Sequence, residues 1–274
     1  MEFKTILVDL TDDEARDARL DAALTLADWS DGNVVGLSAT GPLLDPYRSK
    51  GGEALRYEAM RGDMLRRLHA AGDAAIADAL VRHPSTAGTS HVVIEQETGW
   101  ALAVRGMASD IILPGLPGAN RELPPVMASP AEYALVNSGK PLLIVPPRAR
   151  LAPIETAVVA WNGRREAARA LADAIPLLQR AMQVIIHVVI TRHGPREHGD
   201  GELVKWLAAH GVRARLAVEE ASSVAECLLR KLRDESADLL VAGGYGHSRI
   251  GELVMGGTTR TLIRNLRVPL VISH

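Results

Sequence analysis

The sequence predicts an α/β protein of two tandem domains, each a doubly wound five-stranded parallel sheet. Three observations support this fold class. Short runs rich in Val, Ile and Leu alternate with longer amphipathic segments, which is the pattern of parallel strands joined by right-handed crossover helices. The order of these runs occurs twice along the chain. The length of 274 residues suits two domains of about 100–150 residues each.

The duplication is visible in four pairs of apolar runs that we predict to be strands. The pairs are Thr5–Thr11 with Thr156–Asn162, Asn33–Ser38 with Gln183–Val188, Asp110–Gly115 with Asp238–Gly243, and Pro141–Val145 with Pro269–Ser273. A repeat of this length indicates a duplicated domain rather than a solenoid unit. The offset between partners is about 150 residues in the first two pairs and 128 in the last two. The first half therefore carries an insertion of roughly 22 residues, which we place at 45–67.

The predicted domains are residues 1–147 and 154–274, joined by the proline-marked segment Pro146–Pro153. Apolar residues recur at helical spacing in Arg164–Arg180, which predicts a helix there. Ser223 and Glu226 have the spacing of a capping box and predict a second helix that continues through Leu232. In the insertion, we expect the basic cluster Arg61–His69 to form the outer face of a helix.

Composition excludes several classes of protein. The net charge is −2 and aromatic residues make up 3% of the chain, so neither a basic field nor stacking platforms favour nucleic acid. No apolar stretch reaches the length of a membrane span, and the N-terminus carries no basic leader. We expect a cytoplasmic protein that binds neither nucleic acid nor membrane. The single cysteine, Cys227, excludes a disulfide framework and a zinc site made of cysteines, and we expect it to be a small buried helix residue.

A glycine-rich segment at 243–261 is the strongest functional signal. It follows a predicted strand with the spacing Gly243-x2-Gly246-x9-Gly256-Gly257 and leads into the helical run Thr261–Leu266. Ligands of doubly wound sheets bind beyond the carboxyl ends of the strands. Glycines permit a close approach, and a free helix N-terminus favours a phosphate.

The first half provides an internal comparison. It keeps two glycines, at Gly115 and Gly118, but Ser129, Pro130 and Glu132 fit the first positions of a helix with its own capping box. The second half has Arg260 in that turn instead of an acid. We therefore expect the anion site to be closed in the first half and open in the second.

These glycines, together with a terminal strand of the form Val268–Ser273 and the strand ending His187-Val188, resemble the universal stress protein family over nearly the whole chain. The resemblance implies a Rossmann-like, adenine nucleotide alpha hydrolase-like fold in each half. Some members of the family bind ATP through the glycine motif, others bind no nucleotide, and none is a well-defined catalyst.

Matched position by position, the resemblance makes Gly243, Gly246 and Gly256 the nucleotide-binding glycines, and it places His247 and Ser248 in the phosphate loop. Val188 matches the position whose backbone meets the adenine.

The sequence departs from the family pattern at two points. Gly257 stands where the family has Ser or Thr, and Thr258 and Thr259 follow it. Asn162 stands where an Asp usually faces the adenine and ribose, and it offers a donor and an acceptor without the charge.

The sequence therefore predicts a regulatory stress protein that binds ATP or another adenine nucleotide, with or without Mg²⁺, in its C-terminal half only. A homodimer or an intramolecular pseudo-dimer is expected. A nucleotide-free interaction module is the alternative, and a slow ATPase that uses Glu252 is a third possibility. No catalytic motif is present. No metal site is predicted, because His193 and His198 lie in a polar loop segment without a regular element to orient them.

Overall fold

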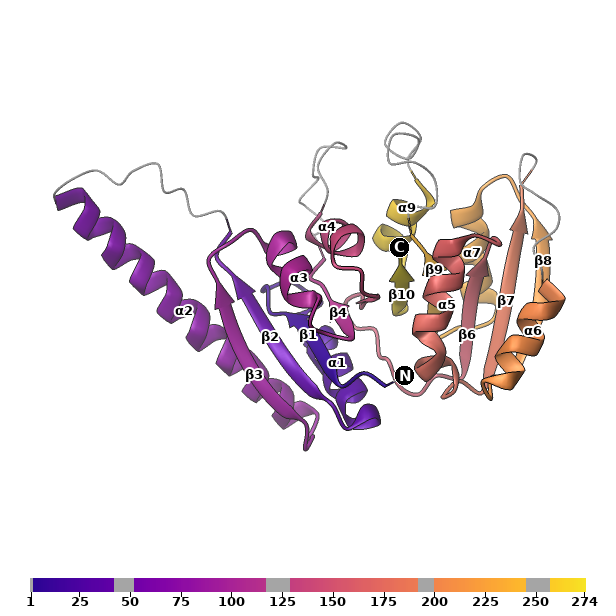
Figure 1. The fold of residues 1–274 in the computed structure, drawn as a ribbon, viewed down its shortest axis with the longest axis horizontal. Helices are drawn as coiled ribbons and strands as arrows, with labels where there is room; N and C mark the ends of the chain where they lie inside the picture. The colour runs from indigo at the N-terminus through magenta and orange to yellow at the C-terminus, as the bar shows by residue number, and fades with distance from the viewer. Residues whose placement is uncertain (1, 42–51, 117–128, 192–199, 245–256) are drawn as a thin grey trace. The chain divides into compact units, whose positions relative to one another are not determined.

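In a computed structural model of the chain, the described residues are 2–41, 52–116, 129–191, 200–244 and 257–274. The chain divides into two compact units. Of the described residues, 3–41, 52–116 and 129–138 form the N-terminal unit, and residue 2 with 139–191, 200–244 and 257–274 forms the C-terminal unit. Figure 1 shows the elements of both units, and each unit is described by itself. The predicted domain bounds 1–147 and 154–274 stay a prediction.

The N-terminal unit is built on four parallel strands in the order β3-β2-β1-β4. Its elements are β1 (Thr5–Asp9), α1 (Arg16–Ser30), β2 (Asn33–Ala39), α2 (Gly52–Arg82), β3 (Gly88–Ile94), α3 (Thr98–Gly106), β4 (Ile111–Leu113) and α4 (Pro130–Asn137). Strands β1 and β4 are buried almost throughout, because helices cover both faces of a parallel sheet.

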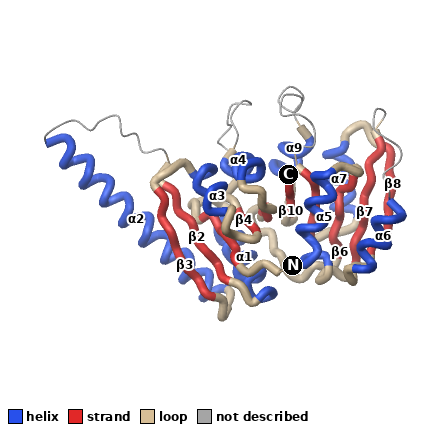
Figure 2. The backbone as a smooth tube through the Cα atoms, in the orientation of Figure 1, coloured by secondary structure: helices blue, strands red, loops and turns tan. Residues whose placement is uncertain are grey.

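The C-terminal unit has the strand order β5-β10-β9-β6-β7-β8. Its elements are β5 (Leu142–Ile144), β6 (Thr156–Trp161), α5 (Arg165–Leu178), β7 (Gln183–Ile190), α6 (Asp200–Ala209), β8 (Ala214–Glu220), α7 (Val224–Asp234), β9 (Leu239–Gly243), α9 (Thr258–Asn265) and β10 (Leu270–Ser273). Neighbouring strands are parallel except β5, which pairs antiparallel with β10. Figure 2 shows the helices in front of and behind the strands. The predicted α/β fold class is confirmed.

The expected helices form where the sequence indicates them. The segment predicted at Arg164–Arg180 is α5, which buries the apolar face of the predicted pattern. Ser223 caps α7 by accepting a hydrogen bond from the backbone N–H of Glu226 at 3.4 Å. Among the described residues, no helix is both long and apolar enough to cross a membrane.

The insertion contributes to helix α2, and the cluster Arg61–His69 lies within it as predicted. Further along this helix, the ring of His91 on β3 fixes α2 to the sheet. Its Nδ1 lies 2.9 Å from the carboxylate of Asp73 on α2, and its Nε2 lies 3.0 Å from the hydroxyl of Ser38 on β2. Gly72 makes room for the ring, because a Cβ at that position would lie 2.2 Å from it.

Candidate functional site

The candidate site lies at the carboxyl ends of β6, β7 and β9 in the C-terminal unit. Strand register places Trp161 beside Val188 and Ala160 beside Ala242. Asn162 directly follows Trp161, and Gly243 directly follows Ala242, so both lie at the same edge of the sheet. This is the edge at which ligands of doubly wound folds bind.

Gly243 is required by packing alone. A Cβ at this position would lie 2.5 Å from the backbone nitrogen of Ala167 and 2.6 Å from the backbone carbon of Glu166. These are backbone atoms of helix α5, which cannot move aside as a flexible side chain would. The first glycine of the motif therefore needs no ligand to explain it.

Helix α9 begins at this edge of the sheet, because it connects the parallel strands β9 and β10. Its N-cap residue is Gly257, and within the described residues no side chain accepts a hydrogen bond at this cap and no acid lies in the first turn. Thr259 is buried at 5% exposure, whereas Thr258 is half-buried. Backbone N–H groups at such a helix end have no intrahelical acceptor.

Helix α4, its counterpart in the N-terminal unit, has a fully formed capping box. The hydroxyl of Ser129 accepts from the backbone N–H of Glu132 at 3.2 Å, and the Glu132 carboxylate accepts from the backbone N–H of Ser129 at 2.6 Å. Pro130 occupies the first turn and has no N–H to donate. The prediction that the N-terminus of this helix is capped by its own side chains is confirmed.

A buried carboxylate also occupies the matching edge of the sheet in the N-terminal unit. Asp9, 1% exposed, ends strand β1. Its Oδ1 accepts from the backbone N–H of Thr11 at 2.9 Å and from the Thr11 hydroxyl at 2.7 Å. Its Oδ2 accepts from the backbone N–H of Gly115 at 2.9 Å. The first glycine of this half therefore donates to the protein's own carboxylate.

A fully buried arginine supports this arrangement. Arg19, 0% exposed, makes two hydrogen bonds of 3.0 Å to the carboxylate of Asp13 and donates to the backbone oxygens of Asp9 and Thr11. Sequence analysis did not identify Asp9, Asp13 or Arg19. The available signal was an acid at the end of an otherwise apolar strand, which is costly to bury without partners.

The C-terminal unit lacks these groups at the matching positions. The duplication pairs Asp9 with Ala160, Asp13 with Arg164 and Arg19 with Ala170. Ala160 and Trp161 are half-buried, whereas Asp9 and Leu10 are buried. At the position of Asp9 the C-terminal unit thus has the small residue Ala160, without the network that Asp9, Asp13 and Arg19 form in the N-terminal unit.

Asn162 takes part in a local turn. Its side-chain oxygen accepts from the backbone N–H of Arg164 at 3.1 Å, and the intervening Gly163 has a φ of 70°. The amide group of Asn162 remains exposed. Val188, in contrast, is fully buried at 0% exposure of the whole residue, backbone included.

Glu166 is an acid beside the glycine strand that sequence analysis missed. It lies in the first turn of α5, is 6% exposed, and accepts from the exposed Arg165 at 2.6 Å. Burial raises its pKa, but the hydrogen bond from Arg165, its own backbone N–H and the nearby His274 outweigh burial and hold the pKa below its ordinary value. The His274 ring lies 3.1 Å from the backbone oxygen of Gly244.

Several predicted residues lie outside the described part of the chain. These are Gly246, His247, Ser248, Gly256, Glu252, His193 and His198. The described members of the predicted site are Asn162, Val188, Gly243, Gly257, Thr258 and Thr259.

Comparison with known proteins finds one similar curated sequence and several similar structures. No known family model matches the chain. The chain is 36% identical over 73 residues to a universal stress protein of Synechocystis, a match that covers 27% of this chain and 24% of the relative. The match therefore spans about a quarter of the length of that relative.

Solved structures extend the similarity to the fold of the whole chain. A universal stress protein from Archaeoglobus fulgidus superposes with a TM-score of 0.73 and 15% identity, covering 100% of this chain and 99% of that one. A functionally unknown protein from Pseudomonas aeruginosa gives 0.58 and 16%, covering 99% and 92%. The resemblance to the universal stress protein family is therefore confirmed, in fold over the full length and in sequence over one segment.

Proposed function

We propose that the protein is a regulatory stress protein that binds an adenine nucleotide, such as ATP, ADP or AMP, in its C-terminal unit only. The observation that carries this proposal is the difference between the two matching helices. The N-terminus of α9 has Gly257 at the cap and no acid in its first turn, whereas Ser129 and Glu132 cap α4. A phosphate group is favoured by the positive dipole end of a helix and repelled by an acid in its first turn, and of these two helices only α9 has no such acid.

The N-terminal unit is a poor candidate for a second site. Asp9 already accepts from the Gly115 N–H, and Asp13 lies beside the same glycine. An approaching phosphate would meet two carboxylates and would lose the donor that the glycine strand offers. We therefore infer one nucleotide per chain.

Helix α9 alone cannot supply the affinity. Micromolar binding requires about 8 kcal/mol, and a helix N-terminus contributes only ~0.3–2 kcal/mol. The adenine and ribose must therefore contact the ends of β6 and β7 near Asn162 and Val188, and further loop N–H groups must contact the phosphates. Mg²⁺ is an optional companion of the phosphates in this proposal.

Two observations favour the alternative of a nucleotide-free interaction module. The packing against α5 explains Gly243 without a ligand. In addition, the edge strand β8 exposes Leu216 and Val218 at 39% and 52%. Dimerisation and a cytoplasmic location likewise stay proposals, as does slow ATP hydrolysis.

The first test is direct binding by the purified full-length chain. We expect adenine nucleotide in the supernatant after heat denaturation, or measurable heat when ATP or AMP is titrated calorimetrically. Absence of both at millimolar nucleotide would rule out nucleotide binding and leave the interaction module.

Two variants at one position then locate the site. Gly257 has φ −52° and ψ 147°, which any residue can adopt. Gly257→Asp places a capping carboxylate at the helix end, so we expect equal or higher thermal stability but at least tenfold weaker nucleotide binding. Gly257→Ser adds a hydroxyl without charge and should bind at least as tightly as the wild type. Equal affinities for all three proteins would place the nucleotide elsewhere.

A matched control uses the other unit. Glu132→Gln removes the acid from the capping box of α4. Since the proposed nucleotide site lies in the C-terminal unit, the stoichiometry and affinity of binding should not change. A second binding event in this variant would contradict the restriction to one unit.

A further inference from the structure

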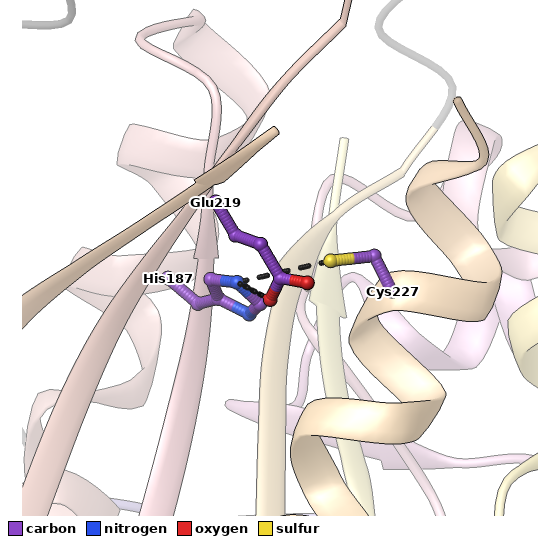
Figure 3. A group of neighbouring side chains, drawn as sticks. All are labelled: His187, Glu219 and Cys227. Carbon is purple, nitrogen blue, oxygen red and sulfur yellow. Dashed lines mark hydrogen bonds and ion pairs between the residues drawn. The ribbon is translucent and has the colours of Figure 1, made fainter. Parts of the chain in front are cut away.

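Three side chains with metal-binding chemistry meet beside strand β8, on the face of the sheet that packs against α7. His187 comes from β7, Glu219 from β8 and Cys227 from α7 (Figure 3). Strand register pairs His187 with Ala217 and Val189 with Glu219. Because side chains alternate along a strand, His187 and Glu219 project from the same face.

The donor atoms of this cluster lie close enough to share one ion. The Nε2 atom of His187 is 3.5 Å from Oε2 of Glu219 and 3.9 Å from Sγ of Cys227. One donor atom from each residue lies within 4.8 Å of the other two. A tetrahedral zinc ion with bonds of about 2.0–2.3 Å would hold its ligands roughly 3.3–3.6 Å apart. The two distances from His187 would therefore contract by a few tenths of an ångström, and the distance between Glu219 and Cys227 by up to about 1.2 Å.

Two of the three side chains are buried, and the third is partly exposed to solvent. His187 and Cys227 are each 1% exposed, whereas the Glu219 side chain is 38% exposed and provides an entry route from solvent. Among the described residues, Nδ1 of His187 has no hydrogen-bond partner, and its Nε2 has only the two long contacts given above. Nε2 is therefore a buried nitrogen with only long contacts, which calls for a further partner, whereas a metal at Nε2 would leave Nδ1 as it is.

Burial sets the protonation states that an entering metal would meet. Burial, with the charge of Lys231, lowers the pKa of His187, so the ring is neutral and keeps a lone pair for a metal. Burial, with Glu219, raises the pKa of Cys227 to about 11, so the free thiol keeps its proton and is unreactive. A metal would replace this proton and release it to solvent.

Two cations compete with a metal ion for this cluster. Arg230 is paired with the Glu219 carboxylate and lies 3.6 Å from the Cys227 sulfur, and Lys231 adds positive charge nearby. The Arg230 side chain is 46% exposed and can turn into solvent when an ion enters.

We propose that His187, Glu219 and Cys227 form a Zn²⁺ site, with a water molecule as the fourth ligand. Thiolate, imidazole and carboxylate together suit zinc, whereas Mg²⁺ and Ca²⁺ prefer oxygen donors. The bound ion would join α7 to β7 and β8 at the edge of the sheet. Metal binding does not depend on the proposed nucleotide site, so either proposal can fail alone.

Cobalt spectroscopy of tag-free, full-length protein tests the site directly. Cys227 is the single cysteine in the sequence, while there are nine histidines, so a thiolate-to-cobalt charge-transfer band can arise only from this cluster. We expect one Co²⁺ per chain to produce this band, and Zn²⁺ to abolish it by displacement. Cys227→Ala should lose the band and the high-affinity Zn²⁺ binding.

Three further variants separate metal ligation from folding. Glu219→Gln should weaken Zn²⁺ binding at least tenfold, whereas Glu220→Gln, at the exposed next position of β8, should leave it unchanged. Arg230→Met removes the competing cation and should tighten Zn²⁺ binding. Circular dichroism of each variant checks that it is folded.

The proposal would be overturned by wild-type protein that gives no charge-transfer band with Co²⁺. Equal Zn²⁺ affinity in the wild type and Cys227→Ala would also overturn it, since the metal would then bind surface histidines. Unchanged affinity in both Glu219→Gln and Arg230→Met would show that the cluster is not the binding site.

Discussion

The carboxylate of Asp9 accepts a hydrogen bond from the backbone N–H of Gly115 across 106 residues of sequence, at a distance of 2.9 Å. This contact joins the ends of β1 and β4 at the edge where the other half of the protein has its candidate nucleotide site. In the second half the same two positions are Ala160 and Gly243. At this edge the first half therefore has a carboxylate that accepts from the glycine, and the second half has a methyl group in its place.

Removing this carboxylate should destabilise the N-terminal unit. Asp9→Ala leaves the N–H group of Gly115 without its acceptor in a buried location and removes the part-buried hydrogen bond from the N–H group of Thr11. Leaving a buried donor unsatisfied, or losing a hydrogen bond to a charged group, costs more than losing an ordinary hydrogen bond. We therefore expect a loss of about 2–3 kcal/mol in the free energy of unfolding. Urea denaturation of the wild type and the variant measures this difference in the free energy of unfolding. Asp12→Asn, whose side chain is 86% exposed, should change stability little, and an equal loss in both variants would contradict the assignment.

Two glycines of helix α2 should respond oppositely to the same substitution. Gly72→Ala would place a Cβ 2.2 Å from the His91 ring, so we expect a loss of roughly 1–3 kcal/mol from overpacking. At Gly62 the nearest atom to a Cβ is the end of the Arg66 side chain at 3.4 Å. Gly62→Ala should therefore stabilise the helix by up to about 1 kcal/mol. Thermal melts of the two variants would refute the His91 contact if both shifted in the same direction.

Gly243→Ala should destabilise the protein even without nucleotide. The added Cβ would meet backbone atoms of Glu166 and Ala167, and backbone contacts of this kind cost roughly 1–3 kcal/mol or more. Differential scanning calorimetry of nucleotide-free protein is the appropriate measurement. An unaltered melting temperature would mean that a ligand, rather than packing, accounts for this glycine.

Glu166 should make stability depend on acid pH. Its folded-state pKa lies below the ordinary value of 4.5, so the unfolded chain takes up a proton first as the pH falls. The stabilisation by ionised Glu166 is therefore complete above about pH 4.5 and is lost as the pH falls through the folded-state pKa. We expect Glu166→Gln to be less stable than the wild type at neutral pH. This difference should shrink in urea melts below pH 4.5, and a constant difference at every pH would contradict the pKa shift.

Local patterns in the sequence predicted the elements and caps well. The capping box of Ser129 and Glu132 and the amphipathic helix α5 depend on residues close together in the chain, so their spacing is visible directly. The duplication extended these predictions to both halves.

Long-range contacts were beyond the reach of the same patterns. Asp9 meets Gly115 and Glu166 meets Gly243 only after the strands have packed, and nothing in the local sequence encodes such pairs. The antiparallel pairing of β5 with β10 was missed for the same reason, because short apolar strands carry no signal of direction. The meeting of His187 with Cys227 likewise depends on which face α7 presents to the sheet.

The contact of His91 with Asp73 and Ser38 has a chemical consequence beyond fixing α2. Serine, histidine and aspartate are connected here in the order found in serine hydrolases. Their accessibility is reversed, however, since Ser38 is 6% exposed and the Asp73 side chain is 66% exposed. A substrate would reach the acid and not the nucleophile. The trio therefore fixes helix α2 to the sheet, and its connectivity alone is no evidence for hydrolase chemistry at Ser38.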